Sequence, residues 1–189
     1  NYNAAANVVR VVATGALPTT LASVSGSGTF GSTATLTATL TSSGQPLADK
    51  AVSFGLNQTT VGSAITNASG VATLTGVSLS GLDAGSSSAV SASFAADAAY
   101  SSSSASGALT VSKAAQSITF DQPATPQLIN ATFVVSPSSS SGLSVSVTAG
   151  GGCTISGGTV TMTSATVACT LTASQAGNAN YNAAEKDRK

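Results

Sequence analysis

The sequence predicts an all-β protein made of two antiparallel sandwiches in tandem, from three observations. Apolar residues alternate with Ser and Thr at a period of two over many short segments, as they do in half-buried strands. Clusters of Gly, Pro, Asn and Ser interrupt these segments at intervals of roughly 8 to 12 residues, the spacing typical of a sandwich. A short phrase around a tyrosine occurs three times, at Tyr2, Tyr100 and Tyr181, which indicates repeated domains.

The repeated phrase sets the expected domain organisation. Residues 1–5 read Asn-Tyr-Asn-Ala-Ala, the same five residues return at 180–184, and a looser copy surrounds Tyr100. The tyrosines are 98 and 81 residues apart (100 − 2 and 181 − 100), which suits small β-domains. We therefore expect a first domain over 1–113, whose residues 1–7 are the tail of a preceding repeat, and a second domain over 114–189.

The first domain shows its strands clearly. Ala34, Leu36, Ala38 and Leu40 alternate with threonines, and a turn cluster follows at 42–46. A turn at 67–70 separates the next inward-facing row from the segment 71–74. The inward-facing rows that continue the pattern are Val52, Phe54 and Leu56; the segment 71–74; Val90, Ala92 and Phe94; and Leu109 and Val111.

The second domain repeats this pattern and includes a hairpin. Alternating segments at 153–156 and 159–162 flank Gly157 and Gly158, and two glycines supply the positive φ angles that a tight hairpin turn needs. Its other inward-facing rows are Ile118 and Phe120; Phe133 and Val135; Leu143, Val145 and Val147; Val167, Cys169, Leu171 and Ala173. After Tyr181 no alternating apolar segment follows, so the closing strand is expected to be missing and residues 185–189 to form a charged, solvated tail.

A strand-like run near the N-terminus has two interpretations. It contains four valines, namely Val8, Val9, Val11 and Val12. In one interpretation the run is the opening strand of the first domain. In the other, it is donated in trans to the open edge of the second domain in the next subunit, which would build a head-to-tail filament.

Composition excludes several classes of function. The formal net charge is zero, which removes an electrostatic basis for binding nucleic acid or an anionic membrane. No apolar run approaches the roughly 20 residues that span a bilayer, so no membrane insertion is expected in this segment. The chain has no His and only six carboxylates, without a spacing that pairs two of them for acid–base chemistry. We expect neither an enzyme nor a cofactor.

The two cysteines are expected to form a disulfide. Cys153 shares a strand face with Ile155, and Cys169 shares one with Val167 and Leu171, so both thiols should point into the core. A bond between the sheets would stabilise a small domain by about 3 kcal/mol. The alternative is two buried, reduced thiols. Zinc binding lacks further Cys or His ligands, and redox catalysis lacks a C-x-x-C pair.

The tyrosine phrases have a structural interpretation. Asp97 and Asn178 each stand three residues before a tyrosine and are suited to cap a turn by Asx-type hydrogen bonds, while Tyr100 and Tyr181 bury their rings at the base of each domain. The alternative is a calcium site at the domain junction that includes Asp97 and Asp121. Calcium prefers six to eight oxygen ligands, so this reading is disfavoured and no metal ligands are assigned.

Two stretches resemble a known family. Residues 44–54 read Gly-Gln-Pro-Leu-Ala-Asp-Lys-Ala-Val-Ser-Phe and, together with 66–74, look like bacterial immunoglobulin-like repeats of large surface proteins. The second domain, from Gln116 through both cysteines to Tyr181, is similar to the companion repeat of long secreted bacterial proteins. The resemblance implies two tandem immunoglobulin-like antiparallel β-sandwiches that serve mostly as stalks, spacers or adhesin segments.

We therefore expect a structural or adhesive module, extracellular or on a bacterial cell surface. It would act as a stalk, spacer or head-to-tail filament subunit, with neighbouring copies or repeats as its partners. The alternative is a carbohydrate- or receptor-binding module of a bacterial adhesin, in which the loops at 82–88 or 150–152 grip the ligand. Loops of small residues without aromatics argue against tight sugar binding.

Overall fold

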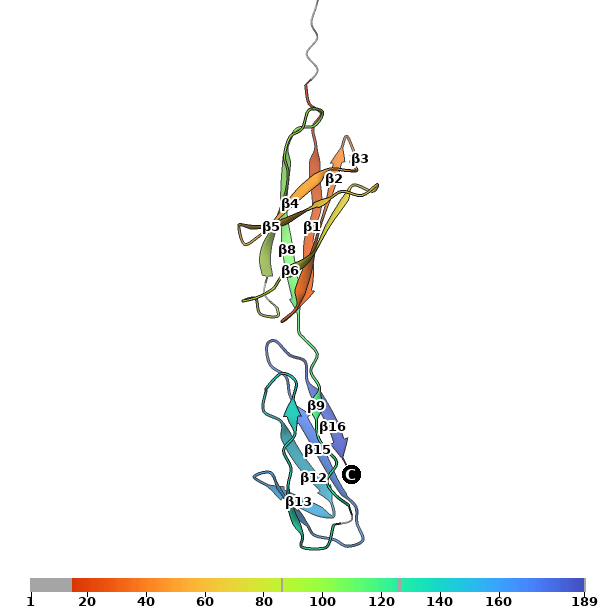
Figure 1. The fold of residues 1–189 in the computed structure, drawn as a ribbon, viewed down its shortest axis with the longest axis vertical. Coiled ribbons are helices and arrows are strands. Elements are labelled where there is room, and N and C mark those ends of the chain that lie inside the picture. The colour runs from red at the N-terminus through yellow and green to blue at the C-terminus, as the bar shows by residue number, and fades with distance from the viewer. Residues whose placement is uncertain (1–14, 86, 126, 189) are drawn as a thin grey trace, which may run out of the picture. The chain divides into compact units, whose positions relative to one another are not determined.

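The structure, a computed structural model, describes residues 15–85, 87–125 and 127–188. Every regular element within these residues is a β-strand, and the sixteen strands form sheets in two sandwich-like assemblies (Figure 1). The predicted all-β fold is confirmed. The strand-like run that contains Val8, Val9, Val11 and Val12 lies outside the described residues.

The first assembly contains eight strands. Along one hydrogen-bonded path their order is β3-β2-β1-β8-β7-β4-β5, and β6 pairs with β2 away from this path. The strands are β1 Thr20–Thr29, β2 Thr33–Ser42, β3 Gln45–Pro46, β4 Ala51–Leu56, β5 Thr59–Ile65, β6 Val71–Ser78, β7 Ser87–Phe94 and β8 Ser103–Ser112.

Strand β1 joins the two layers of this assembly because its backbone kinks at Ser23. Ser23 has a φ of 51°, and across it the buried positions change parity, from Leu21 before the kink to Val24 after it. Near its start β1 contacts β2, where the Thr41 hydroxyl donates to the Thr20 carbonyl. Beyond the kink β1 continues beside β8. A first strand shared between two sheets, with β2 and β6 in one and β4, β7 and β8 in the other, is the arrangement of an immunoglobulin-like sandwich.

The core of the first assembly is made by the inward rows that the alternation predicts. Leu36 and Leu40 of β2 have no exposed surface, and Val52 and Phe54 of β4 face them at 1% exposure or less. Further buried residues come from the strands β6, β7 and β8, namely Ala72, Val90, Ala92, Leu109 and Val111. The apolar residues that alternate at period two in the sequence are therefore the residues that are buried in the sandwich.

The second assembly contains eight shorter strands in three sheets. One sheet has the order β10-β14-β13, a second pairs β11 with β9, and a third has the order β12-β15-β16. The strands are β9 Ile118–Thr119, β10 Thr132–Val134, β11 Ser138–Ser139, β12 Ser146–Gly151, β13 Cys153–Ser156, β14 Thr159–Met162, β15 Cys169–Gln175 and β16 Ala184–Arg188.

The core of the second assembly lies between these sheets. Its buried members are Ile118, Phe120, Cys153, Val160, Leu171 and Ala173. Partly buried apolar residues pack around them, including Phe133, Val147 and Met162. The predicted hairpin is present, because β13 and β14 pair in the antiparallel register on either side of Gly157 and Gly158, both of which have positive φ.

By its internal contacts the chain divides into two compact units. One comprises Asn1–Gly26, Thr35–Val77 and Ser88–Ala108, and the other comprises Ser27–Ala34, Ser78–Ser87 and Leu109–Lys189. This division does not cut the chain at a single point. The expected boundary between residues 113 and 114 therefore stays a prediction.

Two expectations about the second domain were wrong. The closing strand is present, because β16 pairs with β15 in antiparallel register from Gln175 opposite Ala184 to Leu171 opposite Arg188. Pairing uses backbone groups, so a segment without alternating apolar residues can still complete a sheet. Val167 does not belong to the inward row either, since β15 begins at Cys169 and Val167 is 55% exposed.

Candidate functional site: the tyrosine turns and the disulfide corner

The first tyrosine phrase forms a turn held by an aspartate. The Oδ1 atom of Asp97 accepts hydrogen bonds from the backbone N–H of Ala99 at 2.9 Å and of Tyr100 at 2.8 Å. The N–H of Asp97 donates to the carbonyl of Tyr100 at 2.9 Å and closes the turn. This is an Asx-type turn, in which one side-chain oxygen satisfies two backbone donors.

The second phrase forms the same turn with asparagine in place of aspartate. The Oδ1 atom of Asn178 accepts from the N–H of Asn180 at 2.8 Å and of Tyr181 at 2.9 Å. The N–H of Asn178 donates to the carbonyl of Tyr181 at 3.1 Å. The two turns therefore share three hydrogen bonds at equivalent positions, although their first residues differ in charge.

Each turn is joined to the start of its own assembly by a parallel bridge. Leu17 pairs with Tyr100 through two backbone bonds, one from the N–H of Leu17 to the carbonyl of Ala99 and one from the N–H of Ser101 to the carbonyl of Leu17. Ala114 pairs with Tyr181 through the same two bonds, with Asn180 as acceptor and Asn182 as donor. We call this arrangement the tyrosine joint: an Asx turn followed by a parallel bridge to the entering chain.

Lysines support both turns in different ways. The Nζ atom of Lys50 donates to Oδ2 of Asp97 at 2.7 Å and lies 4.8 Å from the centre of the Tyr100 ring. In the second joint, the Nζ atom of Lys113 donates to the backbone carbonyl of Asn178 at 2.7 Å. Both tyrosine rings are half-buried. They thus lie at the edge of the core and are not inside it, since the face of Tyr100 is occupied by the Lys50 ammonium group.

The first turn has a defined electrostatic state. The Lys50 ammonium group, and then the N–H groups of Ala99 and Tyr100, hold the pKa of Asp97 below its usual value of 3.8. Both partners of the ion pair are partly exposed to solvent, so the pair is screened. Asp97 is therefore an ionised cap over most of the pH range, whereas Asn178 performs the same hydrogen bonding without charge.

The cysteines form a disulfide between two sheets of the second assembly. Cys153 begins β13 and Cys169 begins β15, and their Cα atoms are 5.2 Å apart. Just before Cys153 the chain passes from the sheet of β12 and β15 to the sheet of β13 and β14 through Gly151 and Gly152. A Cβ atom on either glycine would come within 2.1 Å of a backbone carbonyl, that of Ala168 or of Val167. We call this region the disulfide corner.

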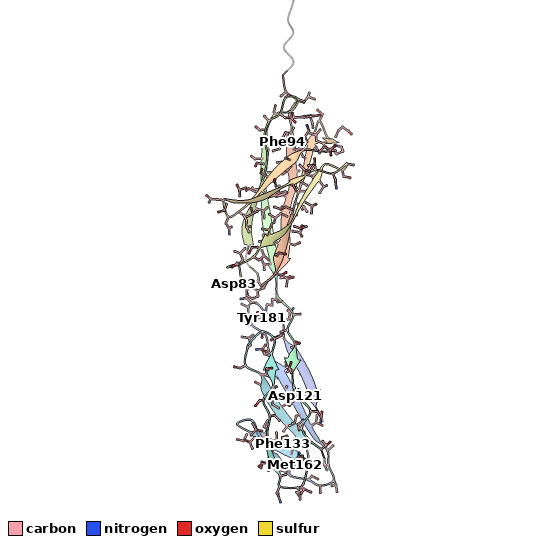
Figure 2. All side chains as sticks on the ribbon, in the orientation of Figure 1. Asp83, Phe94, Asp121, Phe133, Met162 and Tyr181 are labelled. Carbon is pink, nitrogen blue, oxygen red and sulfur yellow. A yellow bond between two sulfur atoms is a disulfide. The ribbon has the colours of Figure 1, made fainter. Side chains whose placement is uncertain are left out.

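A hollow lies beside β10 in the second assembly. It has a volume of about 200 Å³ and is lined mainly by apolar groups, among them Pro123, Phe133, Met162 and Leu171. Figure 2 shows Phe133 and Met162 close together there, as expected from adjacent strands. Near it Leu128 and Val134 are 79% and 71% exposed. The surface around the hollow is therefore apolar.

The other predicted candidates remain dispersed. Within residues 15–85, 87–125 and 127–188, no group of three or more His, Cys, Asp or Glu residues is close enough to hold a metal ion. Asp97, the candidate ligand in the disfavoured calcium alternative, is engaged by its own turn and by Lys50. No helix among the described residues is long and apolar enough to cross a membrane.

Sequence reasoning missed several residues that build these features. Lys50 is far from Asp97 in the sequence, and only the pairing of β4 with β7 brings their neighbourhoods together. Gly151 and Gly152 carried a usable signal, since a run of three glycines beside a buried cysteine is typical of close backbone approach. The loop at 150–152, which the alternative function names as a candidate ligand loop, lies in the disulfide corner.

Comparisons with known proteins add little to this geometry. No protein-family model and no curated protein matches the chain. Among solved structures, one described as tandem Ig repeats of Dlar is similar over 92% of this chain and 99% of its own, with 12% sequence identity and a TM-score of 0.36. A likeness this distant assigns neither a family nor an activity.

Proposed function

We propose that the chain is a structural module of an extracellular, bacterial repeat protein, and that it serves as a stalk or spacer which holds tension along the chain. The observation that supports this most is the tyrosine joint, which occurs in both assemblies with the same hydrogen bonds around Leu17 and Ala114. A joint repeated at this level of detail is typical of modules arranged in series.

The strand geometry of the first assembly suits a load-bearing role. At one end of β1 the Thr19 hydroxyl donates to Ser103, and at the other end the N–H of Phe30 donates to the carbonyl of Ser112. Strands β1 and β8 therefore run side by side in the same direction. Force applied at the start of β1 and the end of β8 loads their hydrogen bonds together in shear.

The disulfide supports the same function and the expected location. It closes a loop of 16 residue steps, which tension cannot extend while the bond is intact. Structural disulfides persist in oxidising compartments such as the outside of the cell. An extracellular location is therefore part of the proposal.

Single-molecule force spectroscopy on the full chain tests the proposal. We expect pulling through residues 20 and 112 to require clearly more force than pulling through residues 20 and 41, which peels β1 from β2 one pair at a time. Reduction should lengthen the extension of the second assembly by about 50 Å, from 16 steps of about 3.4 Å each less the 5.2 Å already spanned. Equal forces in the two pulling directions would contradict the load-bearing role.

The rival function is a ligand-binding module of an adhesin, and the hollow beside β10 is the observation that favours it. Its lining has apolar groups but few polar groups to fix the orientation of a sugar. Screening the full chain on a glycan array distinguishes the two functions. Saturable binding that is lost on changing Phe133 to Ser would support the rival.

A further inference from the structure

We propose that Asn180 and Tyr181 are recognition residues, whose side chains select the module that can precede the second tyrosine joint in the chain. They bind a surface made by Phe30, Asp83 and Ala84, which we call the Asn-Tyr site. All five residues belong to one compact unit, the unit that contains the second assembly. The inference rests on the proposed function, because it assumes modules arranged in series.

The side chain of Asn180 is bound at both ends of its amide group. Its Nδ2 atom donates to Oδ1 of Asp83 at 2.9 Å, and its Oδ1 atom accepts from the backbone N–H of Ala84 at 2.8 Å. A carboxylate can only accept and a backbone N–H can only donate, so the site requires one donor and one acceptor from the same short side chain. Asparagine supplies both.

The ring of Tyr181 makes a second contact with the same site. Its centre lies 5.5 Å from the centre of the Phe30 ring, and the two planes meet at 79°, which is an edge-to-face pair. Both rings are half-buried. The N–H of Phe30 donates to the carbonyl of Ser112 at 2.9 Å, so the backbone beneath this ring is fixed. The ring contact is independent of the amide contact, and together they bind two consecutive residues.

The loop that carries Asp83 and Ala84 is held in place by bonds that do not involve Asn180. The N–H of Leu82 donates to the carbonyl of Leu79 at 3.0 Å, and Leu79 is 2% exposed. The N–H of Gly85 donates to the carbonyl of Val111 at 2.8 Å. These bonds present the carboxylate and the N–H that Asn180 binds, which lowers the entropy cost of binding.

The first tyrosine joint has the same backbone arrangement without this recognition. Its residue before the tyrosine is Ala99, which is exposed and has no side-chain donor or acceptor. The ring of Tyr100 faces the Lys50 ammonium group and not a second ring. Yet the Asx turn and the parallel bridge are the same in both joints. The side chain before the tyrosine is therefore not needed to build a joint, so it is free to recognise a neighbour.

Selectivity follows from what other side chains would do at position 180. Alanine loses both hydrogen bonds and returns the N–H of Ala84 to water. Aspartate lacks a donor and places a second carboxylate beside Asp83. Discrimination of this kind combines a lost attraction with an added repulsion. The Asn-Tyr site thus accepts a joint with asparagine before its tyrosine and rejects one with alanine or aspartate there.

The test is amide hydrogen exchange of the full chain, measured residue by residue by NMR. In Asn180→Ala the Ala84 amide should exchange about tenfold faster, the change expected for one hydrogen bond of ordinary strength. The Gly85 amide is the internal control and should not change. The Tyr181 amide should stay protected, because it donates to Oδ1 of Asn178 within the joint. The matched control variant is Asn182→Ala, which changes an exposed asparagine and should leave the Ala84 amide as it is.

A charge-swap experiment tests the partners directly. Asn180→Asp should weaken the contact at neutral pH, because two carboxylates would face each other. Combining it with Asp83→Asn exchanges the donor and the acceptor, and should restore Ala84 exchange to within about twofold of the unchanged chain. The nuclear Overhauser effect between the rings of Phe30 and Tyr181 should be present in the unchanged chain, weak in Asn180→Asp and recovered in the double variant.

Three results would overturn the proposal. One is Ala84 exchange that Asn180→Ala leaves unchanged, and another is the absence of the ring contact in the unchanged chain. The third is loss of Tyr181 amide protection in Asn180→Ala, which would make Asn180 part of the joint itself. The force measurements load β1 and β8 and do not involve Asn180, so the load-bearing function would stand after any of these. Weak resistance to force in a chain with an intact Asn-Tyr site would overturn the function alone.

Discussion

Replacing Cys153 and Cys169 together by alanine removes the bond that crosses the disulfide corner, and we expect it to destabilise the second assembly by about 3 kcal/mol. The loop closed by the bond is 16 residue steps long. For this length the loss of chain entropy in the unfolded state corresponds to about 10 cal/mol/K, or about 3 kcal/mol at room temperature. A module of this size has a small core, so the loss is a large part of its stability.

The measurement is hydrogen exchange followed by mass spectrometry on the full chain. A loss of about 3 kcal/mol corresponds to exchange through global opening that is on the order of 100-fold faster. The effect should be confined to peptides from β9 to β16. Peptides from β2 and β4 serve as an internal control, because the first assembly contains no cysteine.

Reduction of the unchanged protein provides the second arm, since it breaks the bond without altering the core. The reasoning is refuted if both thiols titrate as free and exchange in β15 is nevertheless unchanged. Equal acceleration in both assemblies would show that they unfold as one unit, and the loop-entropy estimate would then not apply to the second assembly alone.

Three further predictions follow from single side chains. Gly151→Ala should destabilise the second assembly by about 2 kcal/mol or more, because its Cβ would meet a backbone carbonyl at a positive φ, whereas Gly150→Ala has open space and should be tolerated in the same thermal melt. Thr66→Val should cost about 1–3 kcal/mol in chemical denaturation, because the buried hydroxyl accepts from the N–H of Lys50 at 2.9 Å. Asp97 has a lowered pKa, so its stabilisation is present above pH 3.8 and is lost as the pH falls through the lower folded-state value. Asp97→Asn should keep the turn and flatten this acid dependence in melts between about pH 2 and pH 6; an unchanged pH profile would contradict the role of the ion pair.

The alternation of apolar and hydroxylated residues was sufficient to predict much of the fold. It identified the rows of β2 and β4, because a half-buried strand leaves a direct imprint of period two on its sequence. It also identified the hairpin between β13 and β14, whose two glycines are required by the turn. Such features are encoded within about ten residues of one another.

Features that depend on distant partners were not predictable in the same way. The charged segment that became β16 has no alternation, and its place is set by the free backbone groups of β15. The kink of β1 at Ser23 has no glycine or proline to signal it. The contact between Lys50 and Asp97 joins residues 47 positions apart. For β16 and for the contact between Lys50 and Asp97, the determining partner lies elsewhere in the chain, so the local sequence pattern does not predict the feature.

The tyrosine joint has a consequence for how such modules can be combined. The residues that enter it, Leu17 and Ala114, connect only through N–H and C=O groups, which every residue except proline possesses. The capping position accepts either aspartate or asparagine. Domains with unrelated core sequences can therefore be joined within one gene through the same tyrosine joint. The geometry of the joint would stay the same.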